Sequence, residues 1–371
     1  MILPPRVDAV ILGAGFVALA LARELASRGQ DVAVFSAPVS GAGRPSGLVN
    51  AQARRTTDPE ALNEIALFSR HLFAGFVEEL EEVAGFSCDF DVHGAIALAR
   101  TGDEEVALDR ALDWQRARGL SFELLSADET HAREPLAEAQ AAALFPDEGT
   151  VDPGRLRAGL LAAARDEGVR VFAETPVLEL LTEAGRASGV RTLAGPLHAP
   201  FVVNAFGASA ALSGLAGAPA LPLRLHRSLR IELAAPQGLP RTVLARGMKL
   251  VPRRDGTVTL LGDPSEVRDA SLRPGAGEVA RLLDAASAAL PSLARWPLAI
   301  PDALSARLHL GAPDDLPLLG ETETAGYFLA TAFRDDTVLL APAASLLLAD
   351  LVTRQAPAIA MNPFSPARFN L

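Results

Sequence analysis

Residues Val7 to Ser36 read VDAVILGAGFVALALARELASRGQDVAVFS. Asp8 to Leu12 is a short apolar run, typical of a buried parallel strand. A helical stretch follows and stops near Gly29, and Asp31 to Phe35 is a second apolar run of strand type. This segment therefore predicts a strand, a glycine turn, a helix and a second strand.

The turn of this unit carries the pattern G-x-G-x-x-A at Gly13, Gly15 and Ala18. The first glycine allows a tight turn, the second lets a pyrophosphate approach the backbone, and the small third residue lets the helix pack on the strand. The helix start offers free N–H groups and a positive dipole end to phosphates. We predict a dinucleotide site; the alternative is an ordinary βαβ unit. Ser36 favours the alternative, because a ribose-binding Asp or Glu is expected there.

Composition limits the class of protein. A chain of 371 residues with 49% apolar and 21% charged residues predicts a globular protein, with two interleaved domains. The net charge of −11 argues against nucleic acid and anionic membrane surfaces as partners. The single Cys88 excludes an internal disulfide and fits a reducing compartment. No secretory signal is recognisable, and the two longest apolar stretches fall short of a membrane span, so a cytoplasmic location is expected.

The rest of the chain alternates between helix and strand patterns. After Ser36, a small-residue loop carries Arg44 as its only charge, which serves a phosphate or is solvated. Helices are expected over Asp58–Leu80, Asp103–Arg118, from the capping box Ser126–Glu129, after the cap Asp152, over Val279–Leu290 and over Ala341–Val352. Strands are expected as a pair within Phe86–Ala99 that turns at His93–Gly94, and over Leu120–Leu125, Val169–Phe172, Val177–Leu181, Gly189–Leu193, Phe201–Gly207, Pro222–Ala234, Met248–Pro252, Thr257–Gly262, Ala306–Leu310 and Tyr327–Ala332. These patterns indicate an α/β nucleotide-binding domain built from separated segments, with a second domain inserted.

Three stretches together resemble the flavin-dependent amino-acid oxidase superfamily, bacterial glycine oxidase and the D-amino-acid oxidases in particular. The first is the N-terminal motif. The others are GTVDPGRL (149–156) with Thr175–Val177 and VVNAFGA (202–208), and the C-terminal runs GAPDDLPLLG (311–320), GYFLATAFRDDTVLLAPAASLLLADLV (326–352) and NPFSPARF (362–369). The resemblance implies a Rossmann-like FAD-binding domain from residues 1–85, 145–220 and 305–371. It also implies an inserted antiparallel-sheet α+β substrate domain from residues 86–144 and 221–304.

The resemblance further implies where FAD lies. Its pyrophosphate would rest at Gly13–Gly15 and its adenine near Val177, with Ala18, Ser36, Arg44 and the glycine turn at Gly207 as further cofactor-binding positions. The loop before the last helix would offer N–H groups to the carbonyl edge of the flavin, from Asp335, Asp336 and Thr337.

The implied reaction is oxidation of a small amine or amino acid. An arginine clamps the substrate carboxylate, the α-hydrogen leaves as hydride to flavin N5, the imine hydrolyses, and oxygen reoxidises the cofactor. The protein supplies orientation and electrostatics. The expected partners are this small molecule and oxygen, and a homo-oligomer is possible.

The chain departs from the family pattern at the substrate. His309 stands where the carboxylate-binding Arg is expected, within RLHLGA (307–312), and Lys249 stands where glycine oxidases carry Tyr. An imidazole offers at most one donor where a guanidinium offers two. Arg307, two residues before His309 on the same strand, would share its face. His309 acts in the site or is a satisfied structural group, and Lys249 acts in the site or is solvated.

Arg334 keeps its family position within the altered motif AFRDD (332–336), from which a glycine is lost. We expect it to contact substrate or flavin; the alternative is a salt bridge to a neighbouring aspartate. The sites predicted from sequence as catalytic are Arg334, Lys249, His309 and Arg307. The remaining histidines are not spaced as metal ligands, so no metal site is expected.

Two rival functions stay open at this point. One is a flavin dehydrogenase with another electron acceptor or another substrate. The other is a binding or subunit-type protein that keeps the fold without turnover, which Ser36, His309 and the Asp335–Asp336 pair favour.

Overall fold

The computed structural model describes residues 3–36, 43–53, 58–208, 215–236, 238–299 and 303–371. The N-terminal segment folds as predicted, into strand β1 (Ala9–Leu12), helix α1 (Phe16–Ser27) and strand β2 (Val32–Phe35). Strand β1 lies between β2 and β12 (Phe201–Asn204) and pairs with both in parallel. Its position makes the glycine turn after β1 a central feature of the sheet.

In the described residues, the sheet around β1 has six strands in the order β19-β20-β12-β1-β2-β8. The remaining strands are β8 (Arg170–Phe172) and β19 (Leu318–Glu321) at the two edges and β20 (Tyr327–Thr331) between β19 and β12. Ala9 and Ile11 face one hydrophobic core, while Val10 and Leu12 face another. Both faces of the strand are covered, which explains why its sequence is apolar without alternation.

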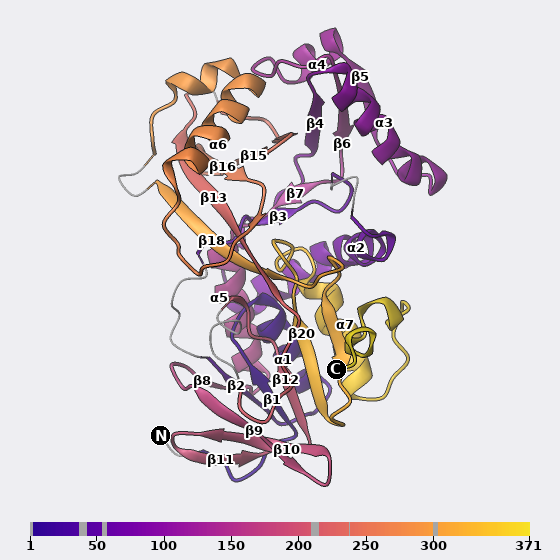
Figure 1. The fold of residues 1–371 in the computed structure, drawn as a ribbon, viewed down its shortest axis with the longest axis vertical. Helices are drawn as coiled ribbons and strands as arrows, with labels where there is room; N and C mark the ends of the chain where they lie inside the picture. The colour runs from indigo at the N-terminus through magenta and orange to yellow at the C-terminus, as the bar shows by residue number, and fades with distance from the viewer. Residues whose placement is uncertain (1–2, 37–42, 54–57, 209–214, 237, 300–302) are drawn as a thin grey trace.

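Helices cover one face of this sheet and a small antiparallel sheet covers the other (Figure 1). The helices are α1, α2 (Glu60–Ala84), α5 (Pro153–Asp166) and α7 (Ala341–Val352). The strands on the other face are β9 (Val177–Glu183), β10 (Arg186–Thr192) and β11 (Gly195–His198). The predicted start of α5 is confirmed: Asp152 Oδ1 accepts a hydrogen bond from the Arg155 N–H at 2.8 Å, and proline opens the helix.

The upper half of the molecule in Figure 1 is built on a second sheet of nine strands in the described chain. They are β4 (Ala95–Ala99), β5 (Glu123–Ser126), β6 (Ala141–Phe145), β13 (Arg224–Ala234), β14 (Thr242–Ala245), β15 (Met248–Pro252), β16 (Thr257–Gly262), β17 (Ser265–Glu266) and β18 (Leu304–Gly311). Helix α6 (Ala276–Ala289) and the 3-10 helix η2 (Pro291–Arg295) pack on it, and α3 (Gly102–Ala117) and α4 (Ala127–Arg133) accompany β4 to β6. The predicted class is confirmed: a Rossmann-like α/β domain and a mainly antiparallel sheet.

Two pairings bear on the domain boundaries. Strand β4 pairs in parallel with β14, which joins the separated segments 86–144 and 221–304 in one sheet. Strand β18 pairs with β13 along its whole length, so it belongs to this sheet although nearly all of it falls in the segment 305–371 predicted for the FAD-binding domain. The boundaries remain a proposal, and the pairing favours assigning β18 to the substrate domain.

The expected strand pair within Phe86–Ala99 is wrong. Only β4 forms there, and it pairs with β6 and β14. The segment 86–94 instead contacts a later part of the chain, through an isolated antiparallel β-bridge between Asp91 and Thr150. A second short pairing, of β3 (Leu48–Val49) with β7 (Gly149–Thr150), lies close by in sequence. Near the C-terminus, the 3-10 helices η3 (Asn362–Phe364) and η4 (Pro366–Phe369) pack against β19.

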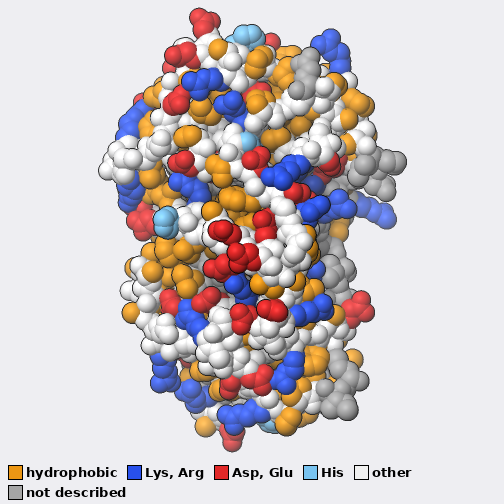
Figure 2. Space-filling view, turned by 180° about the vertical axis from the view of Figure 1, so that it is seen from behind, with side chains coloured by type: hydrophobic (Ala, Val, Ile, Leu, Met, Phe, Trp, Pro, Cys, Tyr) orange, Lys and Arg blue, Asp and Glu red, His pale blue; other side chains and the backbone are white. Residues whose placement is uncertain are grey.

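The surface is mixed in character. On the face drawn in Figure 2, acidic and basic side chains are interspersed, with hydrophobic side chains between them. Among the described helices, none is both long and apolar enough to cross a membrane.

Candidate functional site

The glycine turn between β1 and α1 is shaped for a close ligand. Gly13 has φ 117°, and a Cβ there would lie 2.6 Å from the carbonyl oxygen of Ala205, so a side chain cannot be accommodated. Among the described residues the space around Gly15 is open, since a Cβ there would meet none of their atoms within 4 Å. Gly15 is the N-cap of α1, and no side chain caps that helix. The turn thus fits a dinucleotide pyrophosphate.

The other predicted cofactor positions are spread over several elements, and Ser36 and Gly207 follow the carboxyl ends of β2 and β12. Ala18 is buried beneath the turn. Ser36 follows β2, where its N–H donates to the Phe172 carbonyl at 3.1 Å and its carbonyl accepts from the Thr175 N–H at 2.8 Å. Val177 opens β9 and is half-buried, Gly207 is exposed after β12, and Arg44 is exposed beside a different cavity. Their roles toward a cofactor remain predictions.

A cavity of 490 Å³ lies at the meeting of the two halves. This volume is within the usual range for small-molecule sites. One part of its wall is apolar, with side chains from β4, α3, β6, β14 and β15; they are Ala97, Leu98, Ala107, Leu108, Ala111, Leu112, Phe145, Leu244, Ala245 and Met248. Another part is polar and includes Asn50, Lys249, Arg334, Asp335 and Asp336. The cavity can therefore receive a ligand with a polar head and an apolar substituent.

Arg334 and Lys249, two of the residues predicted as catalytic, both line this cavity, and each has an acidic partner; their role stays a prediction. Arg334 Nη1 lies 2.9 Å from Asp315 Oδ1, and Lys249 Nζ lies 3.2 Å from Asp335 Oδ2. Arg334 thus forms an ion pair with Asp315, whereas the bridge considered from the sequence was to Asp335 or Asp336. The ion pairs reduce the net positive charge that a bound anion would meet.

The turn that carries Arg334 has an unusual backbone. Ala332 and Arg334 both adopt left-handed conformations, with φ 64° and 53°. The Arg334 N–H donates to the Leu310 carbonyl at 2.8 Å, which ties the turn to β18. Non-glycine residues adopt this conformation rarely and at some energetic cost, and such positions cluster at binding sites.

Arg307 and His309 do not line the cavity. On β18, behind the Arg334 turn, His309 is buried and Arg307 is half-buried, and Arg307 Nη2 donates to Thr337 Oγ1 at 3.2 Å. His309 Nδ1 faces the Arg334 carbonyl at 3.2 Å, so it carries the proton, and Nε2 accepts from Ser228 Oγ at 2.6 Å. Burial, and next the charge of Arg307, lower the pKa of His309 to about 3. Its imidazole is neutral and fully paired, which suits a residue that supports the turn.

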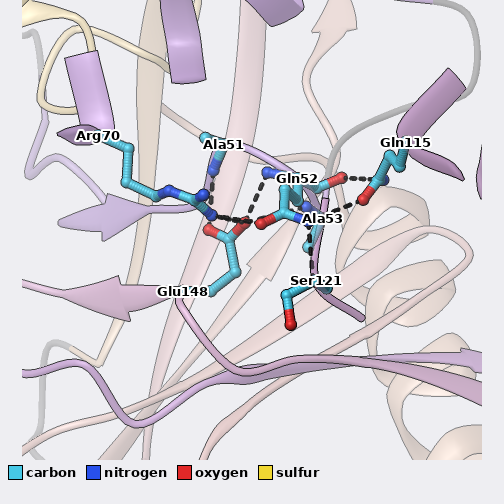
Figure 3. Close-up of polar contacts among 7 residues, drawn as sticks. All are labelled: Ala51, Gln52, Ala53, Arg70, Gln115, Ser121 and Glu148. Atoms are coloured by element: carbon cyan, nitrogen blue, oxygen red, sulfur yellow. Dashed lines mark hydrogen bonds and ion pairs between the residues drawn. The ribbon is translucent and has the colours of Figure 1, made fainter. Parts of the chain in front are cut away.

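A polar cluster that the sequence did not reveal fixes the cavity wall (Figure 3). The buried carboxylate of Glu148 accepts hydrogen bonds from the N–H groups of Ala51 at 2.8 Å, Gln52 at 2.5 Å and, more weakly, Ala53 at 3.4 Å. Arg70 Nη1 lies 3.4 Å from the same carboxylate and donates to Gln52 Oε1 at 2.6 Å. Burial raises the pKa of Glu148 to about 7, with Arg70 and the N–H groups acting in the opposite direction.

Gln52 links this cluster to helix α3. Its Nε2 donates to Gln115 Oε1 at 2.9 Å and to the Ser121 carbonyl at 3.1 Å, and Gln115 Nε2 donates back to the Gln52 carbonyl. Both glutamines line the cavity. The sequence signal for this cluster was only the position of Glu148 before the GTVDPGRL run, which gives no partner for it.

Comparisons with known proteins agree with this arrangement. A family model described as "DAO: FAD dependent oxidoreductase" matches residues 8–351. "Glycine oxidase" of Geobacillus kaustophilus (strain HTA426) is 32% identical over 374 residues, 98% of this chain and 97% of the relative. The crystal structure of glycine oxidase from Geobacillus kaustophilus superposes with a TM-score of 0.88 at 30% identity, covering 98% of each chain. "D-amino acid dehydrogenase" of Cereibacter sphaeroides (strain ATCC 17029 / ATH 2.4.9) is 30% identical over 297 residues, 76% of this chain and 66% of the relative.

Proposed function

This chain belongs to the FAD-dependent oxidoreductase family, and we propose that it is a glycine oxidase-like enzyme that oxidises a small amine or amino acid. The observation that carries the proposal is the cavity in which Lys249, Arg334 and the Asp335–Asp336 pair meet residues 46–53. A bound FAD would supply a hydride acceptor for the substrate carbon next to nitrogen and a route for the electrons to oxygen.

The chain's own residues hold the two ligands. Gly13, Gly15 and the uncapped start of α1 receive the pyrophosphate. The turn after Arg334 would offer backbone N–H groups of Asp335 and Thr337 to the flavin. The Asp336 N–H, predicted from sequence as a third donor, instead donates to the Phe333 carbonyl at 3.0 Å, as the Arg334 N–H does to the Leu310 carbonyl. The apolar wall from α3 and β4 excludes water from the substrate substituent, which strengthens polar contacts at the other end of the cavity.

Lys249 and Arg334 both lie at the cavity, each beside an acidic partner. A substrate carboxylate binds here by sharing these cations with Asp335 and Asp315. The affinity is then lower than a guanidinium with no acidic partner would give, because the ion pairs must rearrange. A substrate amine, in contrast, is favoured by the neighbouring carboxylates.

The test is reduction of the flavin in the purified holoprotein. Glycine, sarcosine, D-alanine, L-alanine and simple alkylamines are added one at a time under anaerobic conditions, and absorbance near the flavin bands is followed. We expect at least one of them to bleach the flavin, and peroxide to form when air is admitted. A flavoprotein that none of these compounds bleaches would contradict the proposal.

A second candidate is a dehydrogenase that passes electrons to an acceptor other than oxygen. The similarity to D-amino acid dehydrogenase of Cereibacter sphaeroides favours it. Anaerobic bleaching combined with no peroxide in air, and turnover restored by an artificial acceptor dye, would support this candidate over the oxidase.

A further inference from the structure

Asn50 carries a buried amide that has no hydrogen-bond partner among the described residues. Its side chain is only 7% exposed, and within the described part of the chain neither Oδ1 nor Nδ2 is paired. Other buried amides nearby are paired, among them Gln52 and Gln115. Buried polar groups are nearly always satisfied in folded proteins, and an unsatisfied one destabilises the fold. Such a group needs a reason to be there.

Asn50 lines the cavity of the proposed site, together with Lys249, Arg334 and Asp335. It therefore lies where a bound substrate can supply the missing partners. An amide offers one acceptor and two donors side by side. A ligand that satisfies it must offer donors and acceptors in the same small group.

The backbone around Asn50 is held on both sides. Before it, Arg230 donates to the Pro45 carbonyl at 2.9 Å and Arg253 to the Ser46 carbonyl at 2.5 Å. After it, Glu148 accepts from the N–H groups of residues 51–53 (Figure 3). Because these anchors are themselves largely buried, the amide is presented in a fixed place and not on an adaptable loop.

We propose that Asn50 is a specificity-determining residue that binds an amino acid, with Oδ1 accepting from the substrate amino group and Nδ2 donating to its carboxylate. This inference rests on the proposed function and narrows it, from amines in general to amino acids. The amide supplies a donor for the carboxylate that does not depend on breaking the ion pairs of Lys249 and Arg334. The apolar wall receives the amino-acid side chain.

The proposal makes a substrate lacking either group a poor match. A simple alkylamine satisfies the acceptor of Asn50 and leaves the donor unpaired, which a buried site penalises strongly. Removing the amide should therefore lower kcat/KM for an amino acid more than for the matching amine, which lacks the carboxylate.

The experiment compares the holoprotein with Asn50→Ala on matched pairs, glycine with methylamine and D- or L-alanine with ethylamine. Asn362→Ala, an exposed asparagine outside the cavity, is the control. We expect kcat/KM for the amino acid to fall roughly 10- to 100-fold in Asn50→Ala, as for loss of a hydrogen bond to a charged group. The value for the matched amine should change less than about threefold, within the spread of near-neutral changes.

Stability and flavin content separate this role from a structural one. The substrate-free holoprotein of Asn50→Ala should keep its flavin and melt no lower than wild type, because an unsatisfied amide has been removed. A lower melting temperature with flavin loss would mean that Asn50 binds the cofactor or supports the fold, and would overturn the proposal. Equal losses for amino acid and amine would overturn it as well.

The proposed function and this inference fail in different ways. If wild type is reduced by ethylamine and by no amino acid, the oxidoreductase proposal stands and the Asn50 proposal is wrong. If no compound reduces the flavin, both are wrong.

Discussion

Replacing Glu148 with glutamine should make the stability of the protein less dependent on pH. Glu148 is fully buried against the backbone of residues 51–53 and next to Arg70, and burial raises its pKa from 4.5 to about 7. Between these two values, the folded protein keeps a proton on Glu148 that the unfolded chain releases. The contribution of Glu148 to the free energy of unfolding is therefore fully present below pH 4.5 and is lost as the pH rises through 7.

The size of this effect follows from the two pKa values. A difference of about 2.5 pH units corresponds to about 3 kcal/mol of unfolding free energy over the whole window, at roughly 1.4 kcal/mol per unit. About 2 kcal/mol of it falls between about pH 5.5 and about pH 8, because part of the loss has occurred by pH 5.5. Glutamine has the same shape as the protonated carboxyl and does not titrate.

Urea denaturation of wild type and Glu148→Gln, followed by circular dichroism across this pH range, measures the effect. A constant offset is expected from the altered hydrogen bonds to residues 51–53. On top of it, the variant should gain about 2 kcal/mol relative to wild type from about pH 5.5 to about pH 8. Comparing the two proteins cancels the titration of all other groups.

Two outcomes would refute the reasoning. A difference that does not vary with pH would show that Glu148 has the same pKa in both states. A change of opposite sign would show that Arg70 and the three N–H groups outweigh burial and lower the pKa of Glu148 below its usual value.

Three further substitutions test the cofactor and substrate contacts. Gly13→Ala should yield protein with little bound flavin, because a Cβ would meet the Ala205 carbonyl at 2.6 Å. The ratio of flavin to protein absorbance measures the flavin content, and folded protein with a full complement of flavin would contradict the prediction. Ser36→Glu should tighten FAD binding up to about tenfold by adding a charge-assisted hydrogen bond to the ribose; an unchanged dissociation constant, with Ser36→Ala as control, would disprove that role. Lys249→Met should raise KM for an amino acid by roughly tenfold and leave the flavin content unchanged, since it removes a cation and its ion pair with Asp335. Steady-state kinetics measure KM, and an unchanged value would place Lys249 outside the substrate site.

His309 is a residue whose role the sequence left open and the tertiary structure clarified. The sequence placed a histidine where the family carries an arginine, and left open a structural or a substrate-binding role. Its contacts to Ser228 and to the Arg334 carbonyl use both ring nitrogens, and its low pKa keeps it neutral. We infer that His309 supports the Arg334 turn, and that it influences substrate binding only through that turn.

The sequence alone determined the elements whose signals are local. The glycine pattern between two apolar runs predicted β1, α1 and β2, and the caps at Asp152 and at Ser126 with Glu129 predicted where α5 and α4 begin. These features depend on residues within about four positions of one another, through turn geometry and cap hydrogen bonds. The resemblance to amino-acid oxidases, carried by longer runs, supplied the family and the FAD.

Only the tertiary structure decided the partners of distant polar residues. Glu148 accepts hydrogen bonds from residues almost a hundred positions away, and β4 pairs in parallel with a strand far along the chain, not with its neighbour as expected. Likewise, only the structure showed that Lys249 pairs with Asp335, and that the amide of Asn50 has no partner among the described residues. A polar residue in a sequence has many possible partners, and which one it meets is set by strand order and packing, so neither its pairing nor its pKa can be read from its neighbours in the chain.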